Sequence, residues 1–137
     1  EFEPKSHKTD IAQALKFLSS TQKKKAIVFV ISDFISEDYE HTLKIASKKH
    51  DITGIRVYDI REEKMPNLGM VSMLDAETGE THLINTGSKS VRINYEKYYQ
   101  EKLKYFKETF SKSGAGVVNT RVDESYVTKL LGYFKSR

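Results

Sequence analysis

Residues 26–34 read Ala-Ile-Val-Phe-Val-Ile-Ser-Asp-Phe, an apolar and largely β-branched run that stops at an aspartate. A continuous apolar run of this length predicts a strand buried on both faces, as in a parallel sheet covered by helices. Ligands of open α/β sheets bind just beyond the carboxyl ends of such strands. Asp33 stands at that end, so its carboxylate is the first candidate for a functional residue.

The spacing of apolar residues predicts the remaining helices and strands. The longest helix is expected to bury one stripe, made of Tyr95, Tyr99, Leu103, Phe106 and Phe110. The last helix is expected to bury Tyr126, Val127, Leu130, Leu131 and Phe134. Predicted strands cover about 26–32, 52–58, 70–74, 81–85 and 115–121, and predicted helices begin at Thr9 or Asp10, Ser36, Asn94 and Asp123.

This order predicts an α/β fold with a partial doubly wound, Rossmann-like and mostly parallel sheet. Helices flank the sheet, and a β-hairpin is inserted at about residues 70–86. A chain of 137 residues fits a single domain, 1–137, with a core of ordinary size.

Composition excludes several classes of protein. The chain has no cysteine, which rules out disulfides and thiolate metal sites, and no apolar stretch approaches the roughly 20 residues of a membrane span. The net charge of +4 comes from 23 basic and 19 acidic residues that are mostly interspersed. Lys23-Lys24-Lys25 is interpreted as a solvated loop, and a nucleic-acid function rests only on a pI near 9.1.

Two oxygen-bearing side chains are candidates for one site. Thr9 starts the helix before the apolar strand and Asp33 ends that strand, so both are expected on the carboxyl rim of the sheet. A hydroxyl and a carboxylate suit Mg²⁺ or Mn²⁺, although two such ligands are too few to hold the ion tightly. The alternative is that Thr9 and Asp33 are helix caps.

Several segments together resemble one protein family. Residues 8–15 (KTDIAQAL) and 31–34 (ISDF) are similar to the second and third metal-site loops of a von Willebrand factor A-type domain. More specifically, the whole chain resembles the C-terminal part of MoxR-associated proteins with domain of unknown function 58 (DUF58). Further segments that carry this resemblance are 49–52 (KHDI), 59–63 (DIREE), Met65-Pro66 with Gly69, 74–80 (LDAETGE) and 134–137 (FKSR).

The resemblance implies a metal-ion-dependent adhesion site, in which Thr9 matches the threonine ligand and Asp33 the aspartate. The main ligands of such sites come from an Asp-x-Ser-x-Ser loop, which occurs nowhere in the 137 residues. The chain also lacks an initiator methionine, so we expect a piece of a longer protein, truncated before that loop. Mg²⁺ or Mn²⁺ is then expected in the intact protein and not in this chain alone.

The same resemblance places the missing metal-site strand beside strand 26–32. Without that neighbour, the strand is expected to form a sheet edge with unpaired N–H and C=O groups. Such edges recruit other strands, so self-association through this edge is expected.

The favoured function is a non-enzymatic protein-interaction module that grips an acidic residue of a partner through the metal. The resemblance implies a MoxR-type AAA ATPase as that partner. It also implies a bacterial, cytoplasmic protein, and whether a membrane anchor lies upstream of this chain is left undecided. The alternative is an Mg²⁺-dependent hydrolase or phosphoryl-transfer enzyme that uses Asp33 and Asp59. No Ser-His-Asp arrangement or Gly-rich phosphate loop favours an enzyme.

Overall fold

The computed structural model describes residues 9–75 and 77–137, so Lys8 of the first matching segment and Ala76 of the hairpin loop lie outside it. Its helices are α1 (Ile11–Thr21), α2 (Glu40–Lys49), α3 (Ile60–Glu63), α4 (Lys89–Lys112) and α5 (Tyr126–Ser136). Its strands are β1 (Ile27–Ser32), β2 (Asp51–Tyr58), β3 (Met70–Leu74), β4 (Thr81–Asn85) and β5 (Gly116–Arg121).

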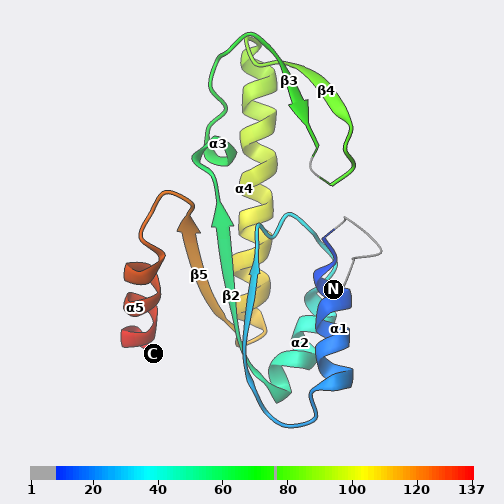
Figure 1. Ribbon diagram of the computed structural model, residues 1–137, viewed down its shortest axis with the longest axis vertical. Helices are drawn as coiled ribbons and strands as arrows, with labels where there is room; N and C mark the ends of the chain where they lie inside the picture. The colour runs from blue at the N-terminus through cyan, green and yellow to red at the C-terminus, as the bar shows by residue number, and fades with distance from the viewer. Residues whose placement is uncertain (1–8, 76) are drawn as a thin grey trace.

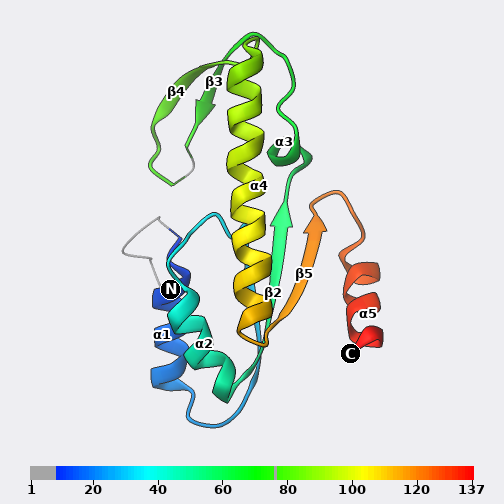
Figure 2. The ribbon, with the colours of Figure 1, turned by 180° about the vertical axis from the view of Figure 1, so that it is seen from behind.

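The strands form a parallel sheet in the order β1-β2-β5 and a separate antiparallel hairpin, β3-β4 (Figure 1). Both crossovers in the parallel sheet step to the next strand in the same direction. Right-handed crossovers therefore bring α2 and α4 to one face, where α1 also packs, while α5 lies on the other face (Figure 2). The predicted α/β class, with a parallel sheet, flanking helices and an inserted hairpin, is confirmed.

Aromatic side chains dominate the core between the sheet and α4. Phe34 stacks on Phe106 with ring centroids 4.1 Å apart, and Phe110 meets Phe106 edge-on at 4.9 Å. All three rings are completely buried, together with Tyr39 of the segment before α2. The rings of Phe106 and Phe110 lie against β2 at Gly54, where a side chain would collide with them.

Substitution of Gly54 by alanine is expected to lower the free energy of unfolding by about 1–3 kcal/mol. An added Cβ would stand 2.5 Å from Cε1 of Phe110 and 2.8 Å from Cε2 of Phe106, so both rings must shift. Gly132→Ala is the matched control, because a Cβ in the middle of α5 meets nothing within 4 Å. Removing a helical glycine there should stabilise by about 0.5–1 kcal/mol. Urea unfolding of both variants checks the opposite signs, and equal shifts would contradict the packing argument.

The prediction that strand 26–32 is buried on both faces is wrong. Val28 and Val30 pack on the core, but Ile27, Phe29 and Ile31 on the other face are 69%, 46% and 67% exposed. Among the residues that the structure describes, β1 pairs only with β2, so the predicted edge position is confirmed. Phe134 of α5 reaches β1, where its ring lies edge-on to that of Phe29 at 6.0 Å. The self-association expected from this edge stays a prediction.

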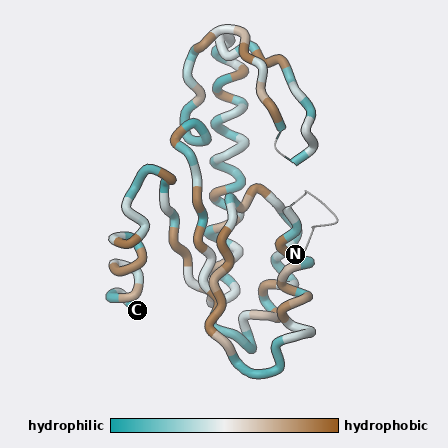
Figure 3. Tube along the Cα trace, in the orientation of Figure 1, coloured by the Kyte–Doolittle hydropathy of each residue, from teal (hydrophilic) through white to brown (hydrophobic). Residues whose placement is uncertain are grey.

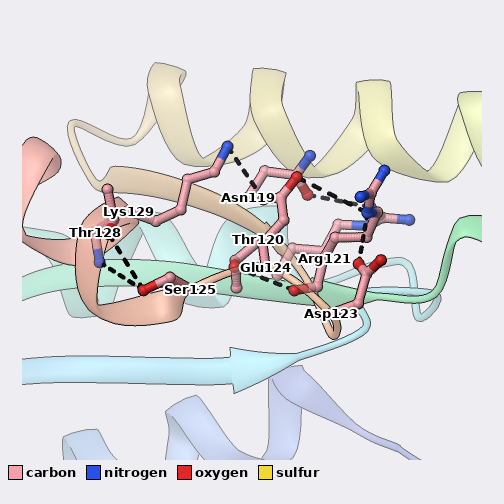
Figure 4. Close-up of polar contacts among 9 residues, drawn as sticks. Asn119, Thr120, Arg121, Asp123, Glu124, Ser125, Thr128 and Lys129 are labelled. Atoms are coloured by element: carbon pink, nitrogen blue, oxygen red, sulfur yellow. Dashed lines mark hydrogen bonds and ion pairs between the residues drawn. The ribbon is translucent and has the colours of Figure 1, made fainter.

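The predictions for the last helix are also wrong. Ser125, not Asp123, is the N-cap, since its hydroxyl accepts the Thr128 N–H, as Figure 4 shows. Asp123 instead binds the guanidinium of Arg121 at 2.6 Å, and this ion pair lowers the pKa of Asp123. No residue of α5 is fully buried, because the helix packs mainly on β5 with its other face open to solvent.

Two other helix starts differ from prediction. Helix α2 begins at Glu40, because the chain after Asp33 first turns Phe34 and Tyr39 into the core, so Ser36 does not cap it. Helix α4 begins at Lys89, five residues before Asn94, after a Ser88 N-cap whose hydroxyl contacts the Ser90 hydroxyl and makes no capping hydrogen bond to a backbone N–H. A start without a capping side chain leaves little trace in the sequence.

Candidate functional site

A cleft of about 460 Å³ opens at the carboxyl edge of the sheet, between the sheet, α3, α4 and the hairpin. Asp33 and Ile35 line it from the end of β1, and Tyr98 and Tyr99 line it from α4. The remaining polar lining comes from Glu62 in α3 and from Asp75, Glu77 and His82 in the hairpin. Four carboxylates therefore face one cleft, which makes its surface acidic.

The backbone after β1 presents Asp33 to this cleft. One carboxylate oxygen of Asp33 accepts the Ile35 N–H at 3.2 Å and lies 3.5 Å from the Ser32 hydroxyl. Phe34 follows with a φ of 56°, a left-handed conformation that is uncommon for a residue other than glycine. Because α2 begins only at Glu40, the alternative that Asp33 caps this helix is wrong.

Thr9 reaches the same rim through the hairpin loop. Its hydroxyl donates to Oε1 of Glu77 at 2.8 Å, and its N–H points at the same oxygen at 3.3 Å. Asp10 caps α1 by accepting the Gln13 N–H, so Thr9 is free of the capping role proposed for it. Glu77 thus connects Thr9 to the cleft that Asp33 lines, although the structure gives no direct contact between Thr9 and Asp33.

These residues do not form a metal site on their own. Within residues 9–75 and 77–137, no three histidine, aspartate or glutamate side chains are arranged to hold a metal ion. The Thr9 hydroxyl is already hydrogen-bonded to Glu77, and one oxygen of Asp33 is engaged by its own turn. Mg²⁺ prefers near-octahedral coordination by several oxygen ligands, which this set does not supply.

Glu62, which lines the cleft, forms a buried ion pair with Arg56. This pair was not predicted from the sequence. Arg56 of β2 is 3% exposed, and its guanidinium binds Glu62 at 3.1 Å and Asn119 of β5 at 3.1 Å. It also lies over the ring of Tyr58, 4.6 Å from the centroid. An arginine inside the otherwise uncharged strand 52–58 was the available signal, since a charge on a buried strand needs a partner.

This pair sets the electrostatics of the cleft floor. Burial raises the pKa of Glu62, the positive charge of Arg56 opposes that rise, and the nearby Asp33 and Asp59 raise the pKa further. Asp59 itself caps α3 by accepting the Arg61 N–H at 2.9 Å. Asp59 does not line the cleft, but Asp33 and Asp59 both lie near enough to Glu62 to raise its pKa, so their use as one catalytic pair stays a hypothesis.

The family model described as "Protein of unknown function DUF58" matches residues 1–105. The chain belongs to the DUF58 family. This match covers α1 through the first two-thirds of α4, and so includes every side chain that lines the cleft. The resemblance to DUF58 proteins is confirmed.

The DUF58 chain is also similar to individual proteins. It is 26% identical over 129 residues to the uncharacterized protein MAV169 of Mycobacterium avium, covering 93% of this chain and 76% of that protein. It is 22% identical over 135 residues to the uncharacterized protein Mb1516 of Mycobacterium bovis, covering 98% of this chain but only 42% of that protein. The DUF58 chain thus spans less than half the length of this second relative.

A solved structure covers most of the DUF58 chain. The crystal structure of the conserved hypothetical protein BatB from Bacteroides thetaiotaomicron aligns with 93% of this chain and 58% of its own, at 15% identity and a TM-score of 0.43.

In the part of the DUF58 chain that the structure describes, no helix is both long and apolar enough to span a lipid bilayer.

Proposed function

We propose that this DUF58 chain is a non-enzymatic protein-interaction module whose partner docks at the cleft beside Asp33. The observation that carries the proposal is the placement of a strand-end carboxylate in an open cleft at the carboxyl edge, where open α/β sheets bind their ligands. The cleft offers carboxylates, tyrosines and one histidine but no described serine or cysteine nucleophile. This composition favours binding over catalysis.

The charge of the cleft bears on the kind of partner. Asp33, Glu62, Asp75 and Glu77 would repel an acidic side chain of a partner unless a cation lay between them. A divalent cation is therefore part of the proposal: Mg²⁺ or Mn²⁺, held by Thr9 and Asp33 together with ligands from outside these 137 residues. On the family resemblance, we propose a MoxR-type AAA ATPase as the partner that supplies the acidic residue.

The test measures binding of the intact protein that contains this chain to the MoxR-type ATPase encoded in the same genome. Asp33→Asn keeps the shape of the side chain and removes its charge, so we expect at least a tenfold loss of affinity for the ATPase. Removal of divalent ions from the unmodified protein with a chelator should cause a loss of the same size. Asp123→Asn is the control, because Asp123 carries the same charge in an exposed ion pair with Arg121. Affinity that Asp33→Asn and chelation leave unchanged would overturn the proposal. Mg²⁺-dependent phosphatase activity that disappears in Asp33→Asn would favour the enzyme instead.

A further inference from the structure

The amino-terminal edge of the sheet, opposite the cleft, concentrates five lysines. Lys23, Lys24 and Lys25 are exposed in the loop between α1 and β1. Lys48 and Lys49 end α2 at the same end of the molecule. We call these five residues the basic edge. In Figure 3 the loop that contains the triplet is the hydrophilic bend at the bottom of the molecule.

Hydrogen bonds hold the two parts of the basic edge side by side. The Lys49 ammonium donates to the carbonyl of Gln22 at 2.8 Å, directly before the triplet. Directly after the triplet, the Ala26 N–H donates to Nδ1 of His50 at 3.1 Å, and the Ala26 carbonyl accepts the Asp51 N–H at 2.9 Å. Lysines that are separate in the sequence therefore share one fixed surface.

The basic edge accounts for the net charge of the chain. Without its five lysines, the other 18 lysines and arginines are matched by 19 aspartates and glutamates. The nearest acidic residue along the chain, Asp51, is bound by the Arg137 guanidinium at 2.7 Å through both carboxylate oxygens. The positive charge of the basic edge is thus left largely uncompensated, while the acidic cleft lies at the other end of the strands.

Three exposed apolar side chains lie near these lysines along the chain, Phe17 and Ile45 on the helices and Ile27 on the opposite face of β1. Phe17, 69% exposed, lies in the second half of α1, the helix that leads into the triplet. Ile27, also 69% exposed, follows the triplet by two residues. Ile45, 50% exposed, is three and four residues before Lys48 and Lys49 and so shares their face of α2.

We propose that the basic edge docks on the surface of a membrane that contains anionic phospholipids. Lysines next to such a surface are attracted to the lipid headgroups, and exposed apolar side chains among them insert at the boundary with the acyl chains. The five charges are all lysine ammonium groups, without the arginine forks that favour specific contacts with nucleic acid. Of the three exposed apolar side chains, only Phe17 offers a ring on which a base can stack, while Ile27 and Ile45 are aliphatic, so a bilayer fits the set better. Docking in this way turns the acidic cleft away from the membrane, toward solvent.

The experiment is co-sedimentation of the chain with vesicles of two compositions, phosphatidylcholine alone and phosphatidylcholine with about 30% phosphatidylglycerol. We expect binding only to the anionic vesicles, with most of it lost when salt is raised from about 0.1 M to about 0.5 M. Neutralising the triplet in K23Q/K24Q/K25Q should lower the partition coefficient by about a hundredfold, at roughly fivefold for each lysine. Phe17→Ser should weaken binding even at low salt, because it removes an inserting side chain.

The matched control is K97Q/K104Q/K107Q, which removes three charges from exposed positions on α4 and leaves the basic edge intact. This variant should keep most of the binding, and thermal melting verifies that every variant is folded. Equal losses in the two triple variants would overturn the assignment to the basic edge. So would the absence of binding to anionic vesicles, or tighter binding to a DNA or RNA duplex than to the vesicles.

Discussion

Phe106→Ala is expected to lower the free energy of unfolding by about 3–5 kcal/mol. Phe106 is completely buried, stacks on Phe34 at 4.1 Å and meets Phe110 at 4.9 Å. Its truncation leaves a cavity between β2 and α4 that these two rings fill only in part. Chemical denaturation monitored by circular dichroism measures the loss.

Ile93→Ala in the same helix is the control for Phe106→Ala. Ile93 is 51% exposed, so its truncation removes little buried surface, and we expect a change within about 0.5 kcal/mol. Similar losses in the two variants would mean that α4 is held by its own helical stability and not by the aromatic core. The argument from ring packing would then fail.

Arg56→Met is expected to destabilise the fold by about 3 kcal/mol. The substitution preserves much of the side-chain volume but leaves the carboxylate of Glu62 and the amide of Asn119 without the guanidinium. Arg61→Met is the control, because the side chain of Arg61 is 79% exposed and its ion pair with Asp59 is screened by water. A loss of the same size in both variants would show that burial of the Arg56 pair does not matter.

For Arg56→Met we also expect a change in how the free energy of unfolding depends on pH. Burial raises the pKa of Glu62 above its ordinary value, so the folded state holds this proton more tightly than the unfolded state. The resulting stability is present below the unfolded pKa, near 4.5, and is lost as the pH rises through the higher folded pKa. Without the positive charge of Arg56, the pKa of Glu62 in the folded state rises further, so more stability is lost as the pH is raised. Urea unfolding between pH ~4 and ~7 should therefore show a steeper decline for Arg56→Met. Adding Glu62→Gln should remove the extra slope.

Local signals in the sequence identified most of the elements. The hairpin strands are observed at Met70–Leu74 and Thr81–Asn85, the same ranges that the sequence predicted. Gly114, just after α4, has a φ of 74°, the left-handed conformation in which glycine commonly ends a helix. What the sequence could not convey is which layer covers each face. The apolar residues of β1 predicted burial on both sides, but α5 packs mainly on β5 and leaves Ile27, Phe29 and Ile31 of β1 exposed.

The candidate site was predicted in part, for a similar reason. The end of an apolar run located Asp33, because strand ends are encoded locally. Arg56, Glu62 and Glu77 come from a strand, a short helix and a hairpin loop that only the tertiary fold brings to one cleft. The contact between Thr9 and Glu77 spans 68 positions, which no spacing rule relates.

Phe34, with its left-handed backbone, connects the aromatic core to the rim at Asp33, so the two are expected to evolve together. Its side chain is a central member of the aromatic core, and its backbone directs the preceding Asp33 to the rim. A mutation that changes the packing around Phe34 would also change the direction of the Asp33 carboxylate. A mutation in the segment after β1 would, in turn, disturb the aromatic core. The core and the rim cannot change independently at this point, so we expect substitutions at Phe34 among homologues to be accompanied by substitutions at Phe106.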